Sequence, residues 1–134
     1  MQQIDISIDD IRALVAQLDS TADVSEESLR HAMLQGYVCF EKNTDGRIVG
    51  MGWIFPRQTL LRKQAVIEDM IVDESYRGKG LGEKILNSLL VWAREQGVEV
   101  VELTTNPKRI AANNLYKKVG FRLHETNHYL LKLS

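Results

Sequence analysis

The chain has 134 residues, of which 44% are hydrophobic and 26% charged, and its formal net charge at pH 7 is −1. This length suits a single domain over residues 1–134 that buries about two-thirds of its unfolded surface. A net charge so close to zero argues against binding to nucleic acid or to a membrane surface, because both need a clustered excess of Lys and Arg.

Before residue 37, the sequence predicts a short strand over residues 2–6 and two helices. Apolar residues recur at helical spacing from Ile8 onward, and Ser7 is placed to cap this first helix. The second helix is expected from Ser25 to Gln35, where a glycine follows and stops it.

The next segment predicts an antiparallel hairpin. Tyr37–Lys42 and Arg47–Phe55 have the composition of strands, and Asn43–Gly46 between them supplies turn chemistry. Pro56 is expected to close the second strand, and the polar residues 57–64 are expected to form a loop.

The second half of the chain predicts a βαβ unit, then a shorter helix and a final hairpin. Strand 65–72, helix 80–96 and strand 98–105 form the unit, and its two strands should be parallel. The shorter helix is expected over roughly 109–119 and the hairpin over 121–133. The expected fold class is α/β, a mixed sheet with helices on both faces.

The junction between strand 65–72 and the following helix carries three alternating glycines, Gly78, Gly80 and Gly82. Glycine lets a backbone approach a ligand closely, and the first N–H groups of a helix have no internal partner. Those donors and the positive helix end favour a bound phosphate. A Walker motif is absent, and the sixth position of a dinucleotide fingerprint counted from Gly78 holds Glu83. The segment predicts a pyrophosphate-binding strand-turn-helix; a turn that only caps the helix is the alternative.

Two strings together resemble the GNAT N-acetyltransferase superfamily. Arg77-x-x-Gly80-x-Gly82 is similar to its acyl-CoA pyrophosphate loop, and Ala112–Phe121 is similar to its second signature, Leu-Tyr followed four residues later by Gly-Phe. The resemblance covers about residues 37–133. It implies the GNAT fold, with a mostly antiparallel central sheet and one parallel βαβ unit, and an acetyl-CoA-dependent N-acetyltransferase.

The resemblance also implies how acetyl-CoA is held. The stretch Met70–Val72 matches the family's central strand, whose backbone pairs with pantetheine and directs one N–H at the thioester oxygen, as in an oxyanion hole. Asn113 is a further candidate, one turn before Tyr116. The expected cofactor-binding residues are Met70, Ile71, Val72, Arg77, Gly78, Lys79, Gly80, Leu81, Gly82, Asn113 and Tyr116.

Tyr116 and Glu68 are the expected catalytic residues. The family's Tyr at the position of Tyr116 protonates the departing thiolate, and a core tyrosine is the alternative. Glu68 and Asp69 are unusual carboxylates in an apolar strand, and the pair is similar to that of glucosamine-6-phosphate acetyltransferases. Glu68 is the proposed general base, with Asp69, a water relay and a purely structural carboxylate as its rivals.

The sequence does not identify the acetyl acceptor. We expect a small-molecule primary amine that attacks the thioester directly; a protein or peptide acceptor and a non-catalytic acyl-CoA-binding domain are the rival interpretations. A homodimer is common in the family. The histidines have no ligand-like spacing with Cys39, so no metal is expected.

No secretion or membrane signal is evident in the sequence. Met1–Asp5 lack the basic and apolar regions of a signal peptide, and no stretch approaches the roughly 18 apolar residues of a spanning helix. The single Cys39 cannot form an internal disulfide, which fits a reducing compartment. A cytoplasmic location is expected.

Overall fold

A computed structural model describes residues 6–134 of the chain. The predicted strand over residues 2–6 falls almost entirely outside this range. The chain divides into two compact units, Met1–Thr104 and Thr105–Ser134, so the expected single domain stays a prediction. The elements in chain order are α1 (Ile8–Leu18), α2 (Glu26–Leu34), β1 (Tyr37–Lys42), β2 (Ile48–Gln58), β3 (Lys63–Val72), the short 3-10 helix η1 (Glu74–Tyr76), α3 (Leu81–Glu95), β4 (Val100–Leu103) and α4 (Ile110–Val119).

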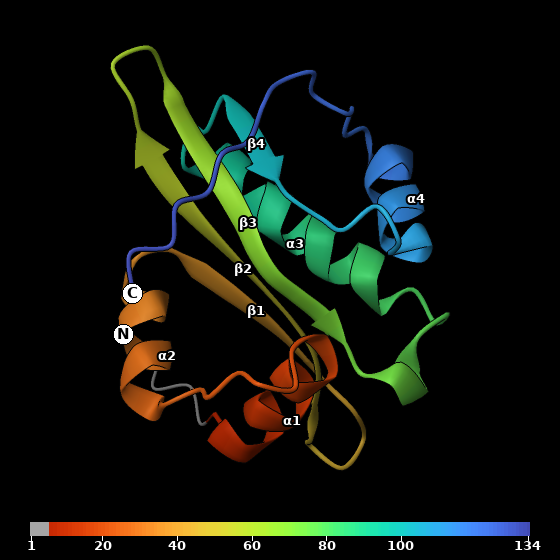
Figure 1. The fold of residues 1–134 in the computed structure, drawn as a ribbon. Coiled ribbons are helices and arrows are strands. Elements are labelled where there is room, and N and C mark those ends of the chain that lie inside the picture. Colours follow the sequence, from red (N-terminus) through yellow and green to blue (C-terminus); the bar gives the residue numbers. More distant parts are fainter. Residues whose placement is uncertain (1–5) are drawn as a thin grey trace. The chain divides into compact units, whose positions relative to one another are not determined.

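The four strands of the first unit form one sheet in the order β1-β2-β3-β4 (Figure 1). The pairs β1·β2 and β2·β3 are antiparallel, whereas β3 and β4 are parallel. This mixed sheet confirms the predicted hairpin and the predicted parallel pair of the βαβ unit. The strand expected over 98–105 is shorter, Val100–Leu103, because its pairing with β3 stops at Leu103.

The expected end of the second strand at Pro56 is wrong. β2 continues through Pro56 to Gln58, and the connection to β3 is only four residues long. Proline is tolerated here because β1 pairs with β2 only as far as Ile54, and no other strand within residues 6–134 pairs with β2 on that side.

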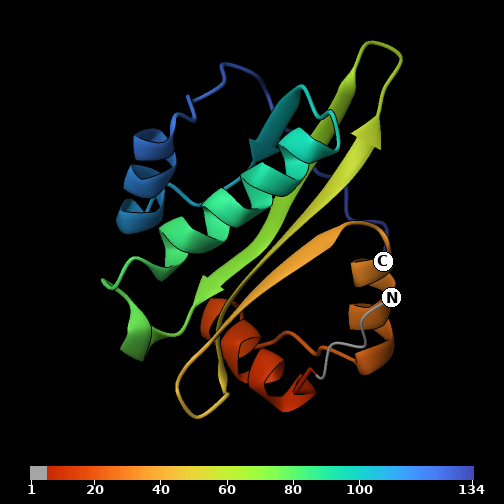
Figure 2. The same cartoon turned by 180° about the vertical axis from the view of Figure 1, so that it is seen from behind.

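Helices cover both faces of this sheet, as predicted: α1 and α2 lie on one face and α3 on the other (Figures 1 and 2). Ile11 and Leu14 of α1 pack in a buried cluster with residues of the three antiparallel strands. On the other face, two glycines of β2 let α3 come close, since a Cβ on Gly50 or Gly52 would meet Ile85 at 2.9 or 2.7 Å.

Serine caps begin the first two helices; Ser7 was predicted as a cap, and Ser25 was predicted as the start of the second helix. The Ser7 hydroxyl accepts a hydrogen bond from the N–H of Asp10 at 3.3 Å, and the Ser25 hydroxyl accepts one from the N–H of Ser28 at 3.0 Å. α3 differs, because its N-cap is Gly80 and no side chain caps its first N–H groups.

The final hairpin predicted over 121–133 is absent, and this segment has no strand in the structure. Its large apolar residues remain exposed; Leu123 is 96% exposed and Leu130 is 89% exposed. A two-stranded hairpin is marginal in water unless a face is buried, and here no burial stabilises it.

Candidate functional site

β3 is interrupted by a bulge at the position of the carboxylate pair. Met51 of β2 pairs with Ile71 and Trp53 pairs with Glu68, so Gly52 alone lies opposite Asp69 and Met70. Asp69 has a φ of 54°, a left-handed conformation that costs a non-glycine residue about 1–2 kcal/mol. Bulges are frequent beside active sites because they redirect the strand.

The second half of β3 has an open edge. β4 pairs with β3 only from Gln64 to Ile67, and among residues 6–134 no strand continues this pairing along Glu68–Val72. Open strand edges present N–H and C=O groups to an extended ligand that carries amides. The resemblance to the GNAT superfamily implies that the backbone of Met70, Ile71 and Val72 pairs with pantetheine, and these residues are part of this open edge.

The turn after β3 presents unpaired backbone donors. Gly78 and Gly80 have φ values of 77° and 81°, which residues with a Cβ rarely adopt. Within the described part of the chain, the N–H groups of Gly78 to Gly82 donate no hydrogen bond. These donors lie at the positive end of a 15-residue helix, the arrangement that anion-binding turns use. We use "cradle" below for residues 77–82.

The side chain of Arg77 ties the cradle back to the strand. Its Nε donates a hydrogen bond to the carbonyl oxygen of Val72 at 3.1 Å. Arg77 therefore fixes the angle between the end of β3 and the turn, in addition to supplying positive charge beside it. Lys79, the other cation of the cradle, is exposed.

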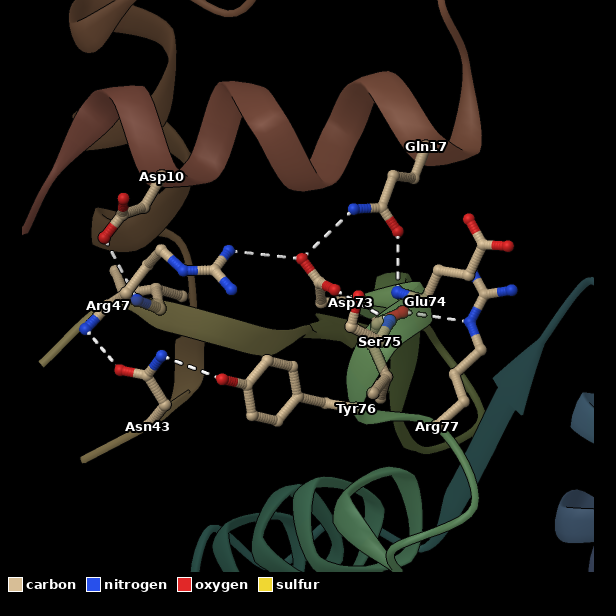
Figure 3. Close-up of polar contacts among 11 residues, drawn as sticks. Asp10, Gln17, Asn43, Arg47, Asp73, Glu74, Ser75, Tyr76 and Arg77 are labelled. Atoms are coloured by element: carbon tan, nitrogen blue, oxygen red, sulfur yellow. Dashed lines mark hydrogen bonds and ion pairs between the residues drawn. The ribbon is translucent and has the colours of Figure 1, made fainter. Parts of the chain in front are cut away.

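Asp73, which sequence reasoning missed, organises the start of this turn (Figure 3). The carboxylate is 6% exposed and accepts hydrogen bonds from the N–H of Ser75 at 2.9 Å and from the side chains of Gln17 and Arg47, both at 3.2 Å. The backbone hydrogen bond from Ser75 is the largest cause that lowers the pKa of Asp73. Gln17 also accepts from the N–H of Glu74 at 2.9 Å.

A cap-type residue after a strand was the available signal for Asp73. Its partners carried no signal, because Gln17 lies 56 residues away in the sequence and Arg47 lies 26 residues away. Only the fold brings α1 and the β1–β2 turn to the base of the cradle.

The two carboxylates on β3 lack partners. Within residues 6–134, the side-chain carboxylates of Glu68 and Asp69 form no hydrogen bond or ion pair, which argues against a purely structural role. Burial raises the pKa of Glu68, and the adjacent charge of Asp69 adds to the effect. Desolvation also raises the pKa of Asp69. A partly desolvated carboxylate with a raised pKa is a better proton acceptor than an exposed one.

Tyr116 and Asn113 belong to the second unit, on α4. Tyr116 is 7% exposed, while Ala112, Leu115 and Val119 are half-buried, so these residues share the less exposed face of α4. Its ring contacts that of Phe121 edge-on, with centroids 6.0 Å apart. Burial raises the pKa of Tyr116, against a smaller lowering by the charge of Arg109. The phenol therefore keeps its proton at neutral pH.

The side-chain amide of Asn113 forms hydrogen bonds within α4 and to the loop before it. Its Nδ2 donates to the carbonyl oxygens of Arg109 at 2.8 Å and of Asn106 at 3.1 Å. These bonds close the first turn of α4, which has no side-chain cap at Arg109. A contact between Asn113 and the cofactor stays a prediction, and Oδ1 is the side-chain atom that would make it.

Neither a metal cluster nor a spanning helix is found in the described part of the chain. Over residues 6–134, no group of three or more His, Cys, Asp or Glu side chains is arranged to hold a metal ion. No helix in this range has the length and apolar character needed to cross a bilayer.

Comparison with known proteins adds independent information. A model of the acetyltransferase (GNAT) family matches residues 8–121, which span both units. Glucosamine 6-phosphate N-acetyltransferase of Trypanosoma brucei is 34% identical over 107 residues, covering 78% of this chain and 69% of that protein. The solved glucosamine-6-phosphate N-acetyltransferase of Arabidopsis thaliana is similar at 25% identity and a TM-score of 0.77, covering 94% of both chains.

Another relative matches over a shorter region. YobR of Bacillus subtilis, an uncharacterized N-acetyltransferase, is 35% identical over 66 residues, or 49% of this chain. The chain spans 27% of the length of that relative.

Proposed function

The chain belongs to the acetyltransferase (GNAT) family, and from this membership we propose that it transfers the acetyl group of acetyl-CoA to the primary amine of a small molecule. It is an N-acetyltransferase by family and fold. The observation that carries the proposal is the run of unpaired N–H groups from Gly78 to Gly82, directly after the open edge of β3. A diphosphate joined to an extended amide-containing arm matches that order of donors.

The residues of the first unit would divide the work of binding. The cradle would bind the diphosphate through backbone N–H groups, and its left-handed glycines keep those groups accessible. The open backbone at Met70, Ile71 and Val72 would pair with the pantetheine amides. Acetyl-CoA supplies an activated thioester, so the protein needs no nucleophile of its own. A strand N–H aimed at the thioester oxygen would contribute a few kcal/mol to catalysis, about 3.

Proton transfer would be divided between two side chains. We assign Glu68 as the general base that accepts a proton from the acceptor ammonium, directly or through water, because its pKa is raised and it has no partner. We assign Tyr116 as the general acid that donates its proton to the departing thiolate, because its raised pKa keeps the phenol protonated. The neutral amine then attacks the thioester directly, with no covalent enzyme intermediate.

Amino-sugar phosphates are the first acceptors to test. Glucosamine 6-phosphate N-acetyltransferases are similar to this chain, one at 34% sequence identity over 107 residues and one in its fold at a TM-score of 0.77. The adjacent Glu68 and Asp69 also give the strand a negative charge that suits a cationic amine.

The test follows the release of free thiol from acetyl-CoA over a panel of amines, with glucosamine 6-phosphate first. We expect thiol release with at least one small amine and a rise in melting temperature with CoA that ATP does not produce. Stabilisation by CoA without turnover of any amine or peptide would leave an acyl-CoA-binding domain. No stabilisation by CoA would contradict the proposal.

A further inference from the structure

Tyr76 lies directly before the cradle, and its ring is fixed by the β1–β2 turn (Figure 3). It is the last residue of η1 and is half-buried. Its hydroxyl oxygen accepts a hydrogen bond from Nδ2 of Asn43 at 3.0 Å. The guanidinium carbon of Arg47 lies 5.7 Å from the ring centroid. Two residues of one remote turn therefore hold one aromatic ring.

The turn that holds the ring is itself rigid. Oδ1 of Asn43 accepts hydrogen bonds from the N–H groups of Asp45 at 3.0 Å and Arg47 at 2.9 Å. The N–H of Asn43 donates to the carbonyl oxygen of Arg47 at 2.9 Å. Arg47 also pairs with the buried carboxylate of Asp73. The phenol is thus anchored to a closed set of hydrogen bonds, and a small shift of the turn would move the ring.

The fixed ring holds the cation of the cradle. Nζ of Lys79 lies 4.9 Å from the Tyr76 centroid, within the range of a cation–π interaction. Among the described residues no carboxylate pairs with Lys79, so the N–H groups of its ammonium remain available to an anion. A lysine side chain held in one place loses less conformational entropy when it binds a phosphate.

We propose that Tyr76 is a positioning residue of the cofactor site, where its ring holds the Lys79 ammonium at the edge of the cradle for a phosphate of the cofactor. This inference rests on the proposed function, since it assumes that CoA occupies the cradle. It adds the β1–β2 turn, remote in sequence, to the parts of the molecule that set cofactor affinity. Asn43 positions the ring of Tyr76 through its hydrogen bond to the hydroxyl group, and the ring in turn positions the ammonium of Lys79.

A double-mutant cycle on CoA affinity tests the proposal. Tyr76→Leu should raise the dissociation constant of CoA about twofold to fivefold, which is the change expected when one exposed cation–π contact is lost. Lys79→Ala should raise it by more, since it also removes the charge. In the Lys79→Ala background, Tyr76→Leu should then have no further effect. Tyr76→Phe, which keeps the ring but loses the hydrogen bond from Asn43, is the matched variant and should raise the dissociation constant of CoA less than Tyr76→Leu does.

The outcomes are separable. If the effects of Tyr76→Leu and Lys79→Ala on the dissociation constant of CoA multiply in the double variant, the inference is overturned. An unchanged CoA affinity in Tyr76→Leu would also overturn it. Both results would leave CoA binding by the wild-type protein intact. Wild-type protein that does not bind CoA would overturn the proposed function itself. Repeating the cycle with dephospho-CoA, which lacks the 3′-phosphate, identifies the phosphate that Lys79 contacts. Coupling between Tyr76 and Lys79 that persists assigns the diphosphate, and coupling that disappears assigns the 3′-phosphate. Either result supports the proposal.

A second measurement covers the case in which Tyr76→Leu does not fold. In wild-type protein, NMR should show the ε-methylene protons of Lys79 shifted upfield by the ring current of Tyr76. The shift should remain when CoA is added and Lys79 contacts phosphate. Its absence from the free protein, or its loss on CoA binding, would contradict the positioning role.

Discussion

The segment from β3 to α3 and the segment 121–134 differ in what holds them. In the first, two flanking elements and a buried carboxylate fix the turn, so the cradle is shaped before any ligand arrives. In the second, leucines remain exposed and no strand forms, although the sequence has the composition of a hairpin. Local sequence signals determine structure only where tertiary burial supports them.

The largest expected effect comes from adding a side chain and a negative charge to the cradle. Gly80→Glu forces a left-handed residue with a Cβ, at about 1–2 kcal/mol, and repels phosphate, so CoA affinity should fall more than about 100-fold. Calorimetry measures this fall in CoA affinity. Gly97→Glu is the matched control, because Gly97 has a φ of 74° and equally open space at the other end of α3. Equal CoA affinity in both variants would remove the cradle from the cofactor site.

Tyr116→Phe tests the acid in the second unit. Without the phenol, turnover should fall about 100-fold, the lower range for general acid catalysis, while CoA affinity changes little. Steady-state kinetics and calorimetry separate the two quantities. Tyr129→Phe is the control, since that tyrosine is 86% exposed. Unchanged turnover in Tyr116→Phe would withdraw its assignment as the acid.

Glu68→Gln should lower turnover about tenfold to 100-fold, less than Tyr116→Phe, because water can take over part of the proton transfer. A base works only when deprotonated, so wild-type turnover should fall as the pH drops through the pKa of Glu68, which lies above its ordinary value of 4.5. The variant should lose this dependence. If Asp69→Asn loses it instead, Asp69 is the base.

Asp73→Asn tests the support of the turn, and a smaller effect is expected. The variant weakens a buried set of hydrogen bonds and should lower the free energy of unfolding by about 1–3 kcal/mol. Because the pKa of Asp73 is lowered on folding, its contribution is present above the ordinary value of 3.8 and is lost as the pH falls through the folded value. Denaturant titrations at pH 7 and in acid measure both effects. Equal stability of variant and wild type at pH 7 would show that the network does not hold the turn.

The smallest effect is expected in segment 121–134. Deleting residues 123–134 removes side chains that are mostly exposed, so the free energy of unfolding should change by less than about 0.5 kcal/mol. Thermal denaturation at several protein concentrations checks this. A large, concentration-dependent loss would mean that the segment is buried against a second copy, as in the homodimers that are common in the family.

The sequence predicted the elements whose signals are local. Ser7 and Ser25 begin their helices, Gly80 and Gly82 open α3, and the β1–β2 turn lies where Asn43–Gly46 indicated. The structure added features that depend on distant partners. The bulge at Asp69 needs the register of β2, and Pro56 is tolerated only because β1 is short.

The candidate site was predicted in the same way. The spacing of Arg77, Gly78 and Gly80 predicted the turn, because such a turn is a local motif, and the structure shows its left-handed glycines. Anion binding at this turn stays a prediction. Asp73 and Tyr76 were missed, since their roles depend on Gln17, Asn43 and Arg47, which the fold brings to them from other elements. No spacing rule connects residues that meet only after the sheet and α1 have assembled.

Backbone amide NMR of the cradle during a CoA titration observes the proposed phosphate-binding N–H groups themselves. The N–H resonances of Gly78, Gly80 and Gly82 should shift as CoA binds, and their exchange with solvent should slow as phosphate accepts their hydrogen bonds. The N–H of Gly97, a left-handed glycine at the opposite end of α3, serves as the internal reference. Saturable CoA binding that leaves the three cradle amides unshifted and unprotected would contradict the account.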